Sequence, residues 1–231
     1  MIEESGCKSC ALLFKNVFKK LSSEQFEYLD SVRNCIILKK GKVLYEEGNR
    51  ITGIYCIKSG VVKIYKTGIE GKEQIIKFAK GGDIFGYRSV INNEPACTGV
   101  TALEDTLLCQ IPSSDLFKLL RENADFALEM LHIACKELDQ SNRFITDIAQ
   151  KSVKERLAEI LLHLKNEFGV NNEDMINLTL TREELANIIG TATESVIRLL
   201  SEFKTEGLIE IHGRKIKIKN ESKLKKICNS Y

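Results

Sequence analysis

Residues 181–200 of this 231-residue chain read TREELANIIGTATESVIRLL, a pattern that predicts two short helices joined by a tight turn. Ala186 is small enough for two helices to cross closely, Gly190 can adopt the positive φ of a turn, and Val196 would fill the core between them. This spacing is typical of a helix-turn-helix, whose second helix lies in the major groove of DNA. A helical hairpin inside an ordinary core would show the same pattern, so the neighbouring sequence has to decide.

A basic β-hairpin follows this stretch. Residues 208–218 read LIEIHGRKIKI and alternate apolar and polar side chains on both sides of His-Gly, which predicts two strands. From Ile211 to Lys226 seven lysines and arginines stand against Glu221 alone, whereas the whole chain carries a net charge of only +2. An ordinary helical core does not predict a basic hairpin here. We therefore favour a winged helix-turn-helix that contacts DNA through a local basic patch.

The first half of the chain is rich in short β-type runs with glycines between them. These runs span residues 35–38, 42–45, 53–57, 61–66, 73–78 and 106–111. Regular short strands of this kind predict a closed antiparallel roll.

The longest helical pattern lies between the two halves, over residues 123–150. Apolar or small residues recur there at alternating spacings of three and four, which is the seam of a coiled coil. The seam residues are Leu131, Ala134, Leu138, Ser141, Ile145 and Ile148. We expect this seam to join two copies of the chain into a homodimer. The alternative is that it packs on the β-roll of its own chain.

The composition fits a globular protein with two domains, since 43% of the residues are hydrophobic and 29% are charged. The acidic residues 1–6 do not resemble a signal peptide, and no apolar run approaches the about 18 residues of a membrane span. We expect a cytoplasmic protein of the α+β class without a membrane partner. The expected parts are an N-terminal extension with a CxxC pair (1–20), a β-roll sensor domain (21–122), a dimerisation helix (123–150) and a winged helix-turn-helix domain (151–231).

An enzyme built on such a roll would need a metal-binding set of His and Glu, or a nucleophile with its base. The three histidines, His132, His163 and His212, fall on two predicted helices and the wing, and none falls in the roll. We therefore do not expect an enzyme.

A β-roll, a long helix and a winged helix-turn-helix, in this order, resemble the cyclic-AMP receptor protein and fumarate-nitrate reduction regulator (CRP/FNR) family of bacterial transcription factors. The most specific matches are residues 181–186, 193–200, 206–209 and 213–216, together with 57–60 and 81–86 in the sensor half. The resemblance implies a DNA-binding regulator with a cyclic-nucleotide-binding-like roll. We also expect RNA polymerase as a partner.

Glu194 and Arg198 match the family's Glu and Arg that read the TGA core of each half-site. Arginine forms a fork to guanine O6 and N7, glutamate accepts from a cytosine amino group, and residues four apart share one helix face. Thr193 replaces an arginine of the cyclic-AMP branch, which leaves the outer base of the half-site open. We expect a palindrome with TGA/TCA arms. The expected DNA contacts are Thr181, Arg182, Thr191, Thr193, Glu194, Ser195, Ile197, Arg198, Arg214 and Lys215.

The sensor half departs from the cyclic-nucleotide branch of the family, in which a Glu after Phe-Gly binds the ribose and a later Arg-Ser/Thr pair binds the phosphate. Here Tyr87 follows Phe85-Gly86, and the later pair is Cys97-Thr98. A buried phosphate would lack its cation, so we expect an unidentified small-molecule effector other than cyclic AMP. Arg88 would substitute only by turning inward, and the alternative is a solvated or interface position.

The candidate effector pocket combines this turn with the long helix. Its residues are Gly86, Tyr87, Arg88, Ser89, Cys97, Thr98, Ser141 and Asn142. The last two match the position of the family's nucleotide-contacting hydroxyls, although polar residues on a dimer seam can equally set its register.

Eight cysteines are scattered through a chain that is large enough to need no disulfide framework, so we expect most of them to be thiols. The oxygen-sensing branch of the family binds an iron–sulfur cluster through N-terminal cysteines and one in the roll. Cys7, Cys10 and Cys109 match three of these ligands, but the third N-terminal position is Asn16. Because a [4Fe–4S] cluster normally takes four thiolates, this set argues against one.

For the Cys7-x-x-Cys10 pair the alternatives are a thiol switch, a metal site or a structural role. Redox control, or no effector at all, remain the alternatives to control by a small molecule.

Overall fold

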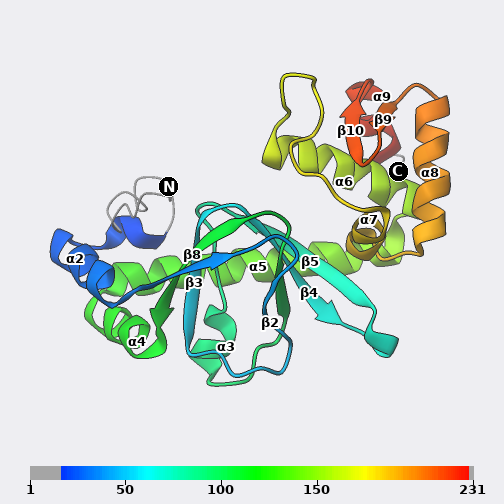
Figure 1. The fold of residues 1–231 in the computed structure, drawn as a ribbon. Helices are drawn as coiled ribbons and strands as arrows, with labels where there is room; N and C mark the ends of the chain where they lie inside the picture. The colour runs from blue at the N-terminus through cyan, green and yellow to red at the C-terminus, as the bar shows by residue number, and fades with distance from the viewer. Residues whose placement is uncertain (1–16, 229–231) are drawn as a thin grey trace. The chain divides into compact units, whose positions relative to one another are not determined.

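The structure is a computed structural model that describes residues 17–228, and the chain divides into two compact units, 1–138 and 139–231. Helix α5 (Ala124–Gln150) contributes its first half to one unit and its second half to the other. The α+β class and the predicted order of roll, long helix and winged helix-turn-helix are confirmed (Figure 1).

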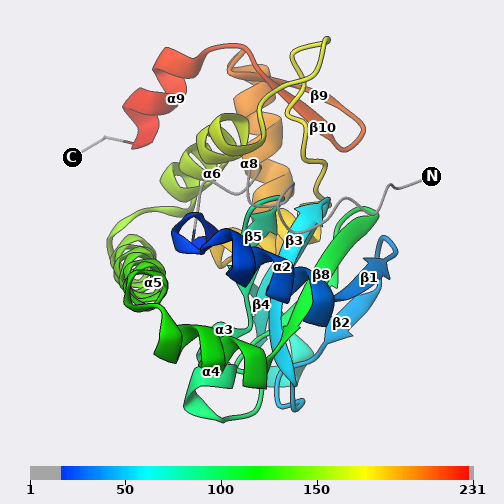
Figure 2. The same cartoon turned by 90° about the vertical axis from the view of Figure 1, so that its left-hand side faces the viewer.

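Two four-stranded antiparallel sheets form the first unit, with strand orders β1-β8-β3-β6 and β2-β7-β4-β5. Their strands are β1 (Asn34–Leu38), β2 (Val43–Tyr45), β3 (Gly53–Ser59), β4 (Val61–Thr67), β5 (Glu73–Lys80), β6 (Ile84–Phe85), β7 (Gly99–Ala102) and β8 (Thr106–Pro112). The short helices are η1 (Val17–Lys20), α2 (Ser23–Val32), η2 (Ile69–Gly71), α3 (Tyr87–Asn92) and α4 (Ser113–Glu122). Figure 2 shows α2 lying in front of the sheet that contains β3 and β8.

The six predicted strands correspond to β1–β5 and β8, whereas β6, β7 and α3 are additions. Strand β6 has only two residues, too few to show a period of two. Strand β7 has four residues and begins at Gly99. A Cβ at this position would lie 2.5 Å from the ring of Tyr65, so the glycine serves close packing inside a strand.

Two hydrophobic clusters form the core of the first unit. One lies between the aromatic and aliphatic inner faces of the two sheets and includes Tyr45, Tyr55 and Phe85. The other packs helices against the β1-β8-β3-β6 sheet, and there Phe126 and Met130 from the start of α5 are fully or almost fully buried. The first half of α5 is thereby anchored to the roll of its own chain.

The second unit is built around α6 (Val153–Phe168), which contacts the other helices of this unit. They are α7 (Arg182–Ile189), α8 (Thr193–Thr205) and α9 (Glu221–Cys228), and the hairpin strands are β9 (Ile209–His212) and β10 (Lys215–Ile218). A strand over residues 178–180 is also expected from the sequence, because Leu178 and Leu180 alternate with a polar residue, but this expectation is wrong. Their alternation reflects the burial of a loop, and the contact with the wing lies upstream, where the Ile176 N–H donates to the Ile216 carbonyl at 2.9 Å.

Across residues 17–228 the helices are all too short or too polar to cross a membrane.

Candidate nucleic-acid interface and sensor region

Local sequence determines the geometry of the two-helix unit. The Thr181 hydroxyl accepts the Glu184 N–H at 3.0 Å, and the Glu184 carboxylate accepts the Thr181 N–H at 2.7 Å, so a capping box starts α7. Gly190 ends α7 with a φ of 68°, which favours glycine. Ala186 and Val196 are buried between the helices. The short turn and small crossing residue therefore fix the angle at which α8 leaves α7.

Helix α8 has one buried and one exposed face. Its buried face consists of Val196, Leu199, Leu200 and Phe203. On the other face Glu194, Ile197 and Arg198 are exposed, and Ile197 keeps 52% of its surface. Ile197 and Arg198 follow Glu194 by three and four residues, so all three lie side by side on the helix. Thr191, Thr193 and Ser195, also expected at the DNA, are half-buried.

Arg182, which is expected at the DNA, makes a hydrogen bond to the wing of its own chain. Its Nη2 donates to the carbonyl of Gly213 at 3.0 Å, which joins the start of α7 to the turn of the β9–β10 hairpin. Burial lowers the pKa of this guanidinium. Its Nη1 is buried and has no hydrogen-bond partner among residues 17–228. Arg182 therefore joins α7 to the wing and its neighbour Thr181 caps α7, and the DNA contacts expected of both residues stay predictions.

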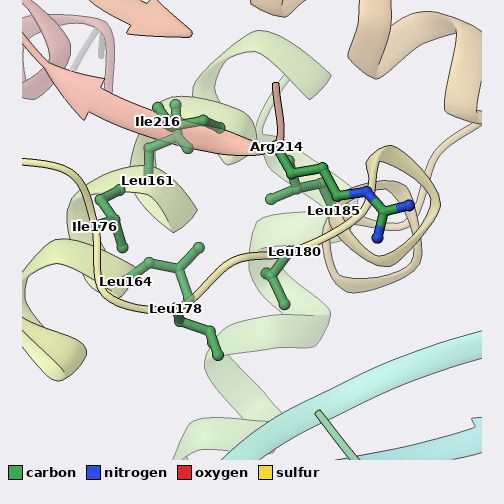
Figure 3. Close-up of a pocket in the computed structure, with 8 residues that line it drawn as sticks. All are labelled: Leu161, Leu164, Ile176, Leu178, Leu180, Leu185, Arg214 and Ile216. Carbon is green, nitrogen blue, oxygen red and sulfur yellow. The ribbon is translucent and has the colours of Figure 1, made fainter. Parts of the chain in front are cut away.

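The wing places Arg214 and Lys215 in solvent. The aliphatic part of Arg214 covers a small apolar cavity, and Figure 3 shows its guanidinium pointing away from Leu164 and Ile176. The cavity holds about 10 Å³, so it has room for no more than a single water and is no ligand site. Arg214 thus packs through its stem while its charge stays at the surface.

Arg156 contacts the two-helix unit in a way that sequence reasoning missed. Its Nη1 donates to the carbonyls of Ile148 at 3.0 Å and Lys151 at 3.2 Å, at the end of α5, and its Nη2 lies 3.5 Å from the carbonyl of Gly190. One guanidinium therefore joins the last turn of α5 to the turn between α7 and α8. Nothing in the local sequence around Arg156 signals this contact.

Lys154 provides a second missed connection, because its Nζ binds Glu202 at 2.5 Å and Glu206 at 3.3 Å on α8. The hydrogen bond that Lys154 donates to Glu202 raises the pKa of Lys154. Helix α8 is thus held to α6 by charge as well as by packing.

The predicted seam on α5 is exposed over most of its length, and Ala134 is its one half-buried residue. Leu131, Leu138 and Ile145 keep 58%, 62% and 65% of their surface. Ala134, however, is half-buried against the core of the first unit. Cys135 and Asn142 continue the exposed spacing instead. We call Leu128, Leu131, Cys135, Leu138, Asn142 and Ile145 the α5 stripe.

Ser141 and Ile148, the other seam residues, are exposed next to the α5 stripe. The first half of α5 therefore packs on its own roll through Phe126 and Met130, while the face that carries the α5 stripe is exposed in the single chain. The homodimer stays a prediction. Ser141 and Asn142 belong to the second unit and the other residues of the predicted effector pocket to the first, so this pocket stays a prediction.

The remaining residues of the predicted pocket lie in helix α3 or next to it. Gly86 begins this helix with a φ of +83°, and a Cβ there would meet Ile51 at 3.2 Å and Tyr55 at 3.3 Å. Tyr87 is buried, and its pKa is raised by burial and by the Glu137 carboxylate. Arg88 is exposed, which agrees with a solvated position rather than an inward one.

The pair Cys97-Thr98 lies against the same helix, because the Ser89 hydroxyl accepts the Cys97 N–H at 3.2 Å. Cys97 and Thr98 are half-buried. The structure therefore brings Ser89 and Cys97 together and directs Arg88 to solvent.

Cys7 and Cys10, two of the three matched cluster ligands, lie outside the described residues. The third, Cys109, is buried in β8, with Cys35 of β1 and Cys56 of β3 as its register partners. Within residues 17–228 no group of three or more His, Cys, Asp or Glu side chains is placed to hold a metal ion. Because two of the three matched ligands lie outside these residues, the prediction about an iron–sulfur cluster stays untested.

Two family models match this chain, a cyclic nucleotide-binding domain over residues 36–123 and a Crp-like helix-turn-helix domain over residues 155–227. The fumarate and nitrate reduction regulatory protein of Yersinia pestis is 26% identical over 227 residues, which cover 97% of this chain and 90% of the relative.

Among solved structures, FixK2 from Bradyrhizobium japonicum is 25% identical, with a TM-score of 0.76, and the match covers 85% of this chain and 97% of that one. A crp/fnr-family regulator from Eubacterium rectale, described as putative, has a TM-score of 0.77 at 23% identity, over 92% of this chain and 97% of that one. The second likeness shows the fold alone.

Proposed function

The chain belongs to the CRP/FNR family of DNA-binding transcription regulators, and on that premise we propose that it reads a palindrome with TGA/TCA arms as a homodimer. Like its relatives it is a regulator, not an enzyme, as the sequence predicts. The observation that carries the proposal is the pair Glu194 and Arg198, exposed four residues apart on the face of α8 opposite its buried side.

The chemistry of this pair suits the TGA arm and its complement. The Arg198 fork donates to O6 and N7 of the guanine, and Glu194 accepts from the amino group of a cytosine. Lys215 and Arg214 on the wing supply cations for phosphates, which add affinity without reading sequence. A two-fold pair of reading helices requires half-sites about one helical turn apart. RNA polymerase remains the partner that we expect for the bound dimer.

The test is a competition between two duplexes at one salt concentration. One carries TGA/TCA arms about one helical turn apart, and the other has the guanine of each arm replaced. We expect Arg198→Ala to lose about 1–3 kcal/mol of discrimination, while Lys215→Ala weakens both complexes equally and lowers the salt slope by about one. Equal weakening of both complexes by Arg198→Ala would contradict base reading by this residue.

The α5 stripe supports the homodimer, because its exposed side chains have the spacing of a coiled-coil seam and four of them, Leu128, Leu131, Leu138 and Ile145, are large and apolar. We expect Leu138→Glu to give a monomer in sedimentation experiments, since two like charges would be buried opposite each other. Ile69→Glu is the matched control, because Ile69 is 90% exposed and lies off the stripe. A dimer that survives Leu138→Glu would show that the interface lies elsewhere.

We propose that the β-roll biases the DNA-reading state through an effector other than cyclic AMP. Arg88 points to solvent and Cys97 stands where the family's phosphate-binding arginine is expected, so a buried phosphate would lack a cation. An effector changes the state only if it binds one conformation better than the other. The duplex titrations repeated with cyclic AMP test this point, since we expect unchanged affinity and an increase would contradict it. Redox control and constitutive activity remain the alternatives.

A further inference from the structure

We propose that Cys35 and Cys109 are a thiol pair that a hydroperoxide oxidises to a disulfide within one chain, with Arg33 as the residue that activates it. The two cysteines lie directly opposite each other, Cys35 on edge strand β1 and Cys109 on its neighbour β8. Opposed residues of antiparallel strands have Cα atoms about 4.5–5.5 Å apart and side chains on the same face. Disulfides span Cα separations of about 4.4–6.8 Å, so the Cα spacing of this register falls within the range that the bond allows.

Arg33 brings a fixed cation to both sulfurs. Its Nη1 hydrogen-bonds to Cys35 Sγ and lies 3.5 Å from Cys109 Sγ. Its Nε donates to Asp30 at 2.7 Å, and its side chain is only 9% exposed. Arg33 also caps the end of α2, because its backbone N–H donates to the Leu29 carbonyl. The guanidinium is therefore held in place on both sides, and a cation beside a thiol stabilises the thiolate that reacts with peroxides.

The two thiols differ in access, which assigns their roles. Cys35 is exposed at the sheet edge, whereas Cys109 keeps only 5% of its surface. The Cys35 thiolate attacks one peroxide oxygen, the O–O bond breaks, hydroxide leaves, and Cys35 becomes a sulfenic acid. The Cys109 sulfur then attacks the Cys35 sulfur, the S–O bond breaks, and water leaves with the Cys109 proton. One peroxide is reduced for each disulfide formed.

Cys56 provides an internal comparison, because it is the register partner of Cys109 on the other side, on β3. It is 4% exposed and buried in the same core cluster as Cys109. It also lies directly opposite Cys109, but peroxide does not reach it from solvent. Access and the guanidinium, rather than strand register alone, therefore select Cys35 as the partner.

The experiment treats the reduced full-length chain with hydrogen peroxide and maps its peptides by mass spectrometry without reduction. We expect one linked pair, Cys35 with Cys109. In Cys109→Ser we expect a sulfenic acid at Cys35, trapped by a cyclic 1,3-diketone, and in Cys35→Ser no linked pair. Cys56→Ser is the matched control and retains the wild-type linkage. Arg33→Gln slows the oxidation about tenfold, and Arg33→Lys, which keeps the charge, restores most of the rate.

Several results would overturn the proposal: linkage of Cys109 to Cys56, linkage of Cys35 to Cys7 or Cys10 or between chains, or an unchanged rate in Arg33→Gln. Iron bound by anaerobically purified protein, lost in Cys109→Ser, would make Cys109 a metal ligand and would also contradict it. The inference does not depend on which bases the chain reads, so the duplex competition and the peptide map can fail independently.

Discussion

The two units hold their functional side chains in place by different interactions. In the second unit, cationic side chains bind backbone oxygens and carboxylates around α8. Arg156 contacts Gly190, Arg182 contacts Gly213, and Lys154 binds Glu202. Each of these contacts lies at or near the surface, where one ion pair or hydrogen bond adds about 1 kcal/mol or less.

In the first unit, the region around α3 is held by buried rings. Tyr55 stacks on Phe85 with ring centroids 5.4 Å apart, and Tyr45 packs on both at 5.6 and 6.4 Å. Burial of such rings contributes several kcal/mol each. We infer that single charged residues adjust the orientation of α8 without unfolding the unit, whereas the sensor region changes only together with its core.

The largest expected effects come from one ring in each core. Phe126 at the start of α5 and Phe203 on α8 are both fully buried. We expect Phe126→Ala and Phe203→Ala each to lower the free energy of unfolding of their own unit by about 3–5 kcal/mol. Hydrogen exchange followed by mass spectrometry localises the effect. Phe203→Ala should raise exchange in residues 153–228, and Phe126→Ala should raise it in residues 17–138. Equal increases throughout the chain in both variants would show that the units unfold together.

A smaller effect is expected when the guanidinium of Arg156 is removed. Arg156→Ala leaves the carbonyls of Ile148, Lys151 and Gly190 without this donor and should weaken binding to the TGA/TCA duplex by about 1 kcal/mol, because hydrogen bonds at or near the surface contribute at this level. Thermal unfolding of the variant should shift little. The matched control is Arg143→Ala, since Arg143 is 76% exposed in an ion pair with Asp139 on α5. Equal loss of DNA affinity in both variants would indicate a general charge effect.

Parts of this molecule that depend on neighbours in sequence are predictable, and parts that depend on distant neighbours are not. The turn at Gly190 and the capping box at Thr181 are encoded within a few residues, and the structure contains both. The contact of Arg156 with Gly190 joins residues 34 positions apart, and no local pattern records it. This contact depends on how α6 packs against α7.

The seam on α5 shows an intermediate case. The spacing of Leu131, Leu138 and Ile145 is visible in the sequence. Between Leu131 and Leu138, however, either Ala134 or Cys135 fits the alternation of three and four. Only the core of the first unit, which covers Ala134, decides between them. The sensor pocket is harder still to predict, because the sequence around Arg88 does not indicate whether this side chain points inward or to solvent.

The smallest expected effect concerns the charge contacts that hold α9 on α6. Glu221 accepts from Lys165 and Lys225, both at 2.6 Å, and these two cations lower its pKa from 4.5 to about 2. A carboxylate whose pKa is lower in the folded chain stabilises the fold above its unfolded pKa, and this contribution is lost as the pH falls through 4.5 toward 2. Glu221→Gln should therefore lower the midpoint of urea unfolding at pH 7 and leave it unchanged near pH 2.

Adding salt tests the same contacts a second way. Glu221 keeps 37% of its side-chain surface, so solvent and dissolved ions screen its ion pairs. We expect the difference between Glu221→Gln and the parent chain at pH 7 to shrink as salt is added. Glu183→Gln, which changes an exposed acid at the start of α7, is the control and should show no comparable dependence on pH. An effect of Glu221→Gln that is equal at pH 7 and near pH 2 would mean that the glutamate acts through packing, and the second unit would then resemble the first in how it holds its helices.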